Sequence, residues 1–175
     1  AGLWEDLGHA QPGDIVLLHG CCHNPTGADL TRGDWVEMAE FLSTRGLVPF
    51  IDIAYQGFGD GLDEDAAGVR LLAQQSDRMI VVASTSKNFG LYRERAGVLL
   101  VICPEDERVQ VQGALESLNR KSISFPPDHG ARVVTNILGD AELRADWEGE
   151  LTAMRDRMND LRRALATALR DACGS

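Results

Sequence analysis

The chain has 175 residues, of which 44% are apolar and 25% charged, a composition that favours one folded domain with a sizeable core. Its net charge of −10 argues against a nucleic-acid-binding surface and against binding to anionic membranes, and no apolar run approaches the roughly 18 residues of a transmembrane helix. The four cysteines include no CxxC pair, and the neighbours Cys21 and Cys22 are poorly placed to bridge each other, so we expect reduced thiols and a cytoplasmic location.

Strand-length apolar runs alternate with helical segments from the start of the chain. The run IVLLH at Ile15–His19 predicts a buried strand. Thr31 begins a predicted helix, Asp34 stands at the third helical position as in a capping box, and Gly46 is a plausible end. The apolar face of this helix is predicted to contain Trp35, Met38, Ala39 and Leu42.

Three further strands are predicted at residues 47–53, Met79–Ser84 and Gly97–Ile102. Asp63 is expected to cap a helix between the first two of these strands, and another helix is expected to begin near Pro104. The buried side of the first helix would hold Val69, Leu72 and Ala73, and the second would carry Val111, Leu115 and Leu118.

The last third of the chain has a different pattern. Apolar residues step by three or four from Leu143 to Leu169, which predicts one long amphipathic helix that could reach toward a second domain. Apolar strands between helices predict an α/β fold with a mainly parallel sheet and helices on both faces.

Polar side chains follow the predicted strands where ligands bind in parallel α/β sheets. Asn24 lies in NPTG after the first strand and could donate to a ligand, although the motif is also ordinary turn chemistry. Asp52 ends the second strand, where a carboxylate needs a cation or hydrogen-bond donors, although it could instead cap a turn. Tyr55 could direct its phenol to the same place.

The third strand is followed by ASTSKNFGLYRERAG, which begins at Ala83. Lys87 directly follows a buried strand and is suited to attack carbonyl carbons, although a solvated lysine in a loop is the alternative. Ser84, Ser86 and Arg95 offer donors for a phosphate, whereas Arg93 is expected to be solvated. A lysine, a carboxylate and phosphate donors together match the requirements of pyridoxal phosphate.

The segments HGCCHNPTG, DIAYQGFGDG and STSKNFGLYRERAG resemble the class I, fold-type I aminotransferases, above all the bacterial aspartate and aromatic amino acid aminotransferases. The resemblance covers essentially the whole chain. It implies a pyridoxal-phosphate enzyme that transfers an amino group from an amino acid to a 2-oxo acid such as 2-oxoglutarate. It also implies that residues 1–138 belong to the cofactor-binding large domain and that residues 139–175 form the helix leading toward a small domain.

The resemblance also assigns roles to individual residues. Lys87 matches the lysine that binds the cofactor covalently and then moves a proton, and Asp52 matches the partner of the pyridine nitrogen. Tyr55 and Asn24 match groups that hydrogen-bond the cofactor's 3′ oxygen, and Asn24 also lies where substrate binds. Ser84, Ser86 and Arg95 match phosphate ligands, His19 matches a histidine that supports the aspartate, and His23 is interpreted as structural.

Arg120 lies in NRKSISFPPDHGARVV, which resembles a family segment whose arginine crosses the dimer interface to bind a substrate carboxylate. The resemblance therefore implies a homodimer and a substrate-binding role for Arg120, although the position also suits a cation at a helix C-terminus. Ile123 and Phe125 depart from the tyrosine and the asparagine or serine usual there, which puts dicarboxylate specificity in question.

The family's chains are more than twice as long, so we expect this chain to be a central part of such a protein, inactive by itself. The phosphate-binding loop and the arginine for the substrate α-carboxylate have no counterpart in it. Two alternatives are open: a lyase or decarboxylase on the same fold, and a truncated product without catalytic activity. The sequence predicts no metal site.

Overall fold

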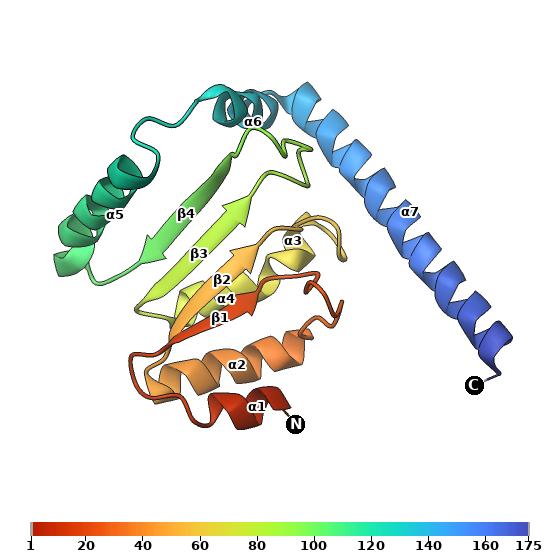
Figure 1. Ribbon diagram of the computed structural model, residues 1–175, viewed down its shortest axis with the longest axis horizontal. Helices are drawn as coiled ribbons and strands as arrows, with labels where there is room; N and C mark the ends of the chain where they lie inside the picture. The colour runs from red at the N-terminus through yellow and green to blue at the C-terminus, as the bar shows by residue number, and fades with distance from the viewer. Residues whose placement is uncertain (1, 175) are drawn as a thin grey trace.

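The computed structural model describes residues 2–174, which form a four-stranded sheet, helices beside it and one long terminal helix (Figure 1). The strands are β1 (Ile15–His19), β2 (Val48–Ile53), β3 (Met79–Ser84) and β4 (Gly97–Ile102). The helices before β4 are α1 (Gly2–Leu7), α2 (Arg32–Arg45), α3 (Leu62–Asp65) and α4 (Ala67–Gln75). Beyond β4 follow a 3₁₀ turn at Glu105–Glu107, α5 (Arg108–Ser122), α6 (His129–Gly139) and α7 (Ala141–Cys173).

The strands lie in the order β1-β2-β3-β4, with β1, β2 and β3 parallel and β4 antiparallel at the edge. The predicted mainly parallel sheet is therefore confirmed. Carboxyl ends of the three parallel strands point toward α7 (Figure 1). This edge is where ligands bind in folds of this type.

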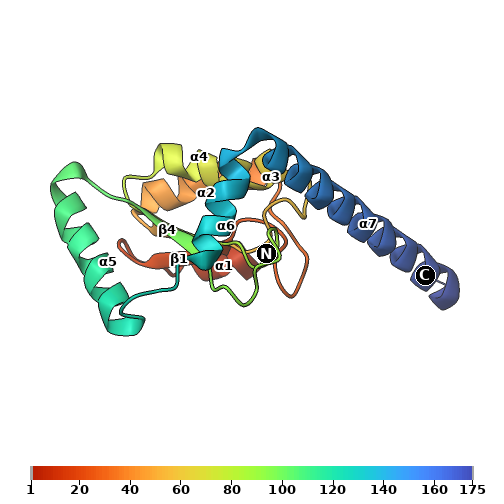
Figure 2. The same cartoon turned by 90° about the horizontal axis from the view of Figure 1, so that it is seen from above.

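One face of the sheet carries the core. Val16, Leu18, Ile51, Met79 and Val81 are buried there together with apolar residues of α2 and α4, which lie on the same side of the sheet (Figure 2). The predicted apolar face of α2 is confirmed, since Trp35, Met38, Ala39 and Leu42 are all buried.

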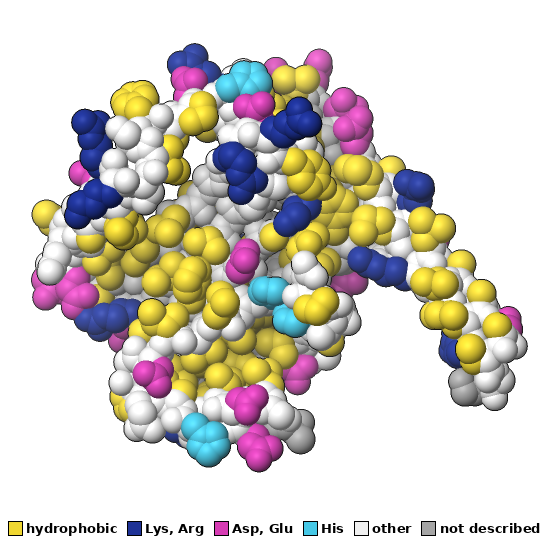
Figure 3. Space-filling model, in the orientation of Figure 1, with side chains coloured by type: hydrophobic (Ala, Val, Ile, Leu, Met, Phe, Trp, Pro, Cys, Tyr) yellow, Lys and Arg dark blue, Asp and Glu magenta, His cyan; other side chains and the backbone are white. Residues whose placement is uncertain are grey.

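The opposite face is open in the described part of the chain, which differs from the prediction of helices on both faces. Ile15 and Leu17 of β1 are 59% and 61% exposed, and apolar side chains spread across this side of the molecule (Figure 3). The reason is topological. Successive right-handed crossovers that progress in one direction, from β1 to β2 to β3, place all their helices on one face.

The predicted helix ends are confirmed for α2, whereas the predicted N-cap near α3 is wrong. Thr31 caps α2 in a capping box with Asp34, and Gly46 ends it with φ 64°. Asp63, by contrast, is not a helix cap: it lies inside α3, whose N-cap is Gly61, and it pairs with Arg70 on the surface. The prediction of one long terminal helix is confirmed by α7, which has 33 residues.

Candidate functional site

Sheet register brings two predicted site residues together. His19 of β1 is the direct neighbour of Asp52 in β2. Because side chains alternate along a strand, His19 shares the open face with Leu17, and Asp52 lies on the face opposite to buried Ile51 and Ile53. The site therefore forms on the side of the sheet that α2 and α4 leave free.

A cavity of about 160 Å³ lies at these strand ends. The Lys87 amine lies 4.4 Å from the centre of the Tyr55 ring. Within residues 2–174, neither the Lys87 amine nor the Asp52 carboxylate has a hydrogen bond or ion pair with another side chain, so both are free to meet a ligand. The cavity is lined by His19, Cys21, Asn24, Asp52, Ala54, Tyr55 and Lys87.

The three predicted phosphate donors do not line this cavity. The Ser84 hydroxyl donates to the Ser86 hydroxyl at 2.9 Å, and the Ser86 backbone N–H donates to Ser84 Oγ at 3.1 Å. Arg95 is exposed, has φ 52° and donates to the carbonyl of Tyr92 at 3.0 Å. The neighbouring Arg93 is exposed, as expected. The two serines are thus held together, whereas the guanidinium is engaged with its own loop.

Two carboxylates that the sequence did not single out shape the loops around the cavity. Asp29 accepts hydrogen bonds from the backbone N–H groups of Cys22 and His23, both at 2.8 Å. Asp65 is buried and accepts from Gly57, Gly59 and Asp60 at 2.7, 3.0 and 2.9 Å. These bonds fix the segments that carry Asn24 and Tyr55. The glycines after Tyr55 are the sequence feature that could have indicated this close approach of a carboxylate, since a Cβ at Gly59 would lie 2.5 Å from Asp65 Oδ1.

The two histidines of the first loop lie together. The ring of His23 is 4.5 Å from that of His19, and its Nδ1 shares a hydrogen bond with the Thr26 hydroxyl. These contacts place His23 within the fold of the loop.

The pKa values of the neighbouring thiols Cys21 and Cys22 are shifted in opposite directions. A hydrogen bond between the two thiols raises the pKa of Cys21 above its ordinary value and lowers the pKa of Cys22 below it, and burial of Cys21 raises its pKa further. All four cysteines of the chain are free.

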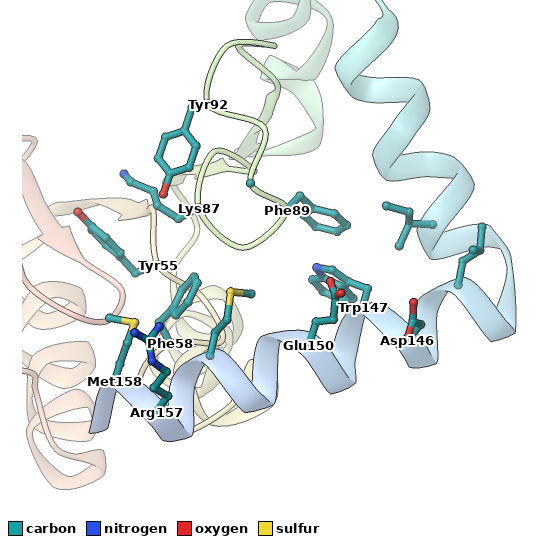
Figure 4. Close-up of a pocket in the computed structure, with 14 residues that line it drawn as sticks. Tyr55, Phe58, Lys87, Phe89, Tyr92, Asp146, Trp147, Glu150, Arg157 and Met158 are labelled. Atoms are coloured by element: carbon teal, nitrogen blue, oxygen red, sulfur yellow. The ribbon is translucent and has the colours of Figure 1, made fainter. Parts of the chain in front are cut away.

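A larger pocket of about 630 Å³ extends from Lys87 and Tyr55 to α7 (Figure 4). Its walls are mostly apolar and include Phe89 and Trp147, whose rings are stacked with centres 4.3 Å apart. In the sequence, Trp147 is recognisable only as part of the apolar stripe of the terminal helix. Its contact with the Lys87 loop required the tertiary structure.

Arg120 lies away from both pockets. It is exposed in the last turn of α5, beside Lys121, and Ile123 and Phe125 beyond the helix end are 60% and 89% exposed. This geometry is compatible with a cation at a helix C-terminus and with a residue that acts outside its own chain.

Residues 2–174 contain no cluster of three or more His, Cys, Asp or Glu side chains suited to a metal ion. In the same part of the chain, no helix combines the length and the apolar character that crossing a membrane requires.

The chain is similar to known proteins along its whole length. The sequence profile of the family "Aminotransferase class I and II" matches residues 1–174. An aromatic-amino-acid aminotransferase of Paracoccus denitrificans is 55% identical over 99% of this chain, and an aspartate aminotransferase of Pseudomonas aeruginosa is 49% identical over 97%. The match covers 44% and 43% of those two relatives, so the chain spans less than half their length.

Solved structures give the same result. An aromatic amino acid aminotransferase with 3-indolepropionic acid superposes with a TM-score of 0.96 at 55% identity, over 99% of this chain and 45% of that one. An aromatic-amino-acid aminotransferase from Burkholderia pseudomallei, covalently bound to pyridoxal phosphate, gives 0.93 at 45% identity, over 98% and 43%. Both the sequence and the fold of this chain match aminotransferases over 99% of its residues. The chain therefore belongs to the class I and II aminotransferases.

Proposed function

We propose that the chain is the cofactor-binding part of a pyridoxal-phosphate-dependent aminotransferase that acts on aspartate, aromatic amino acids or both, with a 2-oxo acid as the amino acceptor. One observation carries the proposal: an amine at Lys87 and a carboxylate at Asp52, each without a side-chain hydrogen bond or ion pair in the described residues, line the same cavity. The relatives' names supply the two substrate classes.

The donor set of the cavity fits this cofactor. Lys87 would bind it covalently, Asp52 would face its ring nitrogen, and Asn24 and Tyr55 would hydrogen-bond its ring oxygen. When bound, the cofactor supplies an electron sink that makes the substrate Cα–H acidic. Ser84 and Ser86 would turn their hydroxyls to the phosphate, and Arg95 would join them after exchanging its bond to the Tyr92 carbonyl.

Each group of the chain has a distinct task in the transfer. The Asp52 carboxylate would hold a proton on the ring nitrogen by charge attraction, with His19 beside it in the sheet. Once released from the cofactor, the Lys87 amine would act as general base toward the substrate Cα–H and then as general acid for the return of that proton. The Tyr55 ring lies 4.4 Å from that amine and so limits its positions.

We also propose that residues 1–138 belong to a large domain and that α7 leads toward a part of the protein outside this chain. The protein would act as a homodimer in which Arg120 reaches the partner's substrate. Exposure of Arg120 and Phe125 supports this role, because both are available to a neighbouring molecule. A cytoplasmic location is supported by the four free cysteines.

The test uses the complete gene product that contains this chain. After incubation with pyridoxal phosphate and reduction with borohydride, mass spectrometry should find the label on the peptide that contains Lys87. Lys121, the chain's other lysine, is the matched control: Lys121→Ala should keep the label and Lys87→Ala should lose it. Label that persists in Lys87→Ala would refute the assignment.

A second assay separates transamination from the other chemistries of this fold. The purified protein, given aspartate or phenylalanine with 2-oxoglutarate, should form glutamate. Release of carbon dioxide without glutamate would identify a decarboxylase instead. The 175-residue chain by itself should form no glutamate, because orienting the substrate contributes several kcal/mol to such a reaction and the arginine expected for this is not in the chain.

A further inference from the structure

One face of α7 docks onto the two loops that carry Lys87 and Tyr55. Trp147, Leu151 and Asn159 are four and eight residues apart, a spacing that places them on the same side of a helix. Leu151 is 1% exposed and packs over Gly57, where Cβ would lie 2.5 Å from Leu151 Cδ2. The Asn159 amide donates to the carbonyl of Gly59 at 3.2 Å. The helix therefore contacts the site's own loops.

Trp147 contacts the two residues that follow Lys87. Its indole N–H donates to the backbone carbonyl of Asn88 at 2.7 Å, and its ring stacks on Phe89 at an interplanar angle of 11° (Figure 4). Asn88 and Phe89 are the two residues that follow Lys87. One side chain thus holds both the backbone and the ring next to the reactive lysine.

Few other hydrogen bonds hold the segment that Trp147 contacts. Asn88 Nδ2 donates to the Gln56 carbonyl at 3.3 Å, while Asn88 Oδ1 is buried without a partner in the described residues. Inside the segment, the Gly90 N–H donates to the Lys87 carbonyl at 3.1 Å and the Phe89 N–H donates to the Thr85 carbonyl at 3.3 Å. The bond from Trp147 is shorter than these three, so its loss should loosen the segment.

We propose that Trp147 is a positioning residue for Lys87. By fixing the carbonyl of Asn88 and the ring of Phe89, it sets the direction in which the Lys87 side chain leaves the backbone. Displacement of a reacting group by about 1 Å can cost about 100-fold in rate, so such control has a measurable consequence. The proposal rests on the proposed function, because it concerns the approach of Lys87 to the cofactor.

The test uses two complementary variants of the complete gene product. Trp147→Phe removes the indole N–H and keeps a ring for stacking, whereas Phe89→Leu removes the stacked ring and keeps the hydrogen bond. Trp4→Phe is the matched control, since Trp4 packs edge-on against Phe41 in the α1–α2 region. Phe89→Leu also keeps the proposal testable if Trp147→Phe does not fold.

The first readout needs no cofactor. Hydrogen exchange of the peptide that covers residues 85–91 should be faster in Trp147→Phe and in Phe89→Leu than in Trp4→Phe or the unsubstituted protein. Exchange in β1 should be unchanged. Equal exchange of the 85–91 peptide in all four proteins would overturn the proposal.

The second readout separates attachment of the cofactor from its binding. Trp147→Phe should slow covalent attachment of pyridoxal phosphate at Lys87, followed by visible absorbance, by about 2- to 10-fold, the effect of one hydrogen bond. In a Lys87→Ala background, the same change should leave the affinity for the cofactor unaltered. An equal loss of affinity in both backgrounds would show a general structural contact and overturn the positioning role.

The two proposals fail in different ways. If the unsubstituted protein attaches no cofactor at Lys87, the proposed function fails, and the exchange rates alone then decide whether Trp147 holds the turn. If the cofactor attaches at the same rate in Trp147→Phe, the positioning role fails and the proposed function stands.

Discussion

Replacement of Gly57 by alanine is expected to destabilise the contact between the Tyr55 loop and α7. Gly57 lies two positions after Tyr55, has φ 94° and packs beneath Leu151 of α7. Alanine at this position would be strained, because an L-residue in the left-handed region costs roughly 1–2 kcal/mol. Its Cβ would also meet Leu151 Cδ2 at 2.5 Å and Leu62 Cδ2 at 3.1 Å, and overpacking of this kind costs about 1–3 kcal/mol. Gly57→Ala should therefore lower the free energy of unfolding by about 2–5 kcal/mol.

The two contributions can be separated with a double variant. Leu151→Ala removes the nearest side-chain atoms that Cβ would meet and leaves Leu62 Cδ2 at 3.1 Å, and by itself it should cost about 2–5 kcal/mol as a buried leucine. In that background, Gly57→Ala should cost mainly the backbone strain, roughly 1–2 kcal/mol. Denaturant unfolding of the four proteins gives the coupling energy between the two sites.

Gly113→Ala is the matched control, because Gly113 lies in α5 with nothing within 4 Å of a built Cβ. Alanine there should be neutral or stabilise the protein by up to about 1 kcal/mol. If the effects of Gly57→Ala and Leu151→Ala simply add, within about 0.5 kcal/mol, α7 does not pack on the Tyr55 loop in solution.

Three further predictions concern charge and acidity. Hydrogen bonds from Thr31 lower the pKa of Asp34, so this carboxylate adds stability above its unfolded pKa of about 3.9 that is lost as pH falls through the native value. The stability difference between the unsubstituted protein and Asp34→Asn, measured by denaturant midpoints, should therefore shrink between about pH 5 and pH 3; a constant difference would contradict it. Cys22 should react with iodoacetamide at lower pH than a cysteine in a short peptide. Cys21→Ala should move the pH profile of this reaction to higher pH, because the hydrogen bond that lowers the pKa of Cys22 is lost. Arg95→Ala should weaken pyridoxal phosphate binding about 10- to 100-fold in an equilibrium titration, and unchanged affinity would mean that this arginine serves only its own loop.

Local chemistry in the sequence was sufficient for the four strands, for α2 and for several residues that line the cavity. Apolar runs of five to seven residues, the Thr31 capping box and Gly46 predicted strands and a helix that the structure confirms. Lys87, Asp52 and Asn24 could be singled out because each lies at the end of an apolar run or in the loop after it, and strand ends in a parallel sheet meet at one edge. These features depend on contacts within a few residues, which a single sequence displays.

Contacts between distant segments were decided only by the tertiary structure. Asp63 looks like a helix cap in sequence, but the buried Asp65 two residues later takes the backbone N–H groups of the loop instead. The contact of Trp147 with Asn88 joins residues 59 positions apart, and helical periodicity identifies an apolar face without naming what it packs against. One open face of the sheet follows from the direction of the crossovers, a property of strand order that the apolar pattern of each strand does not encode.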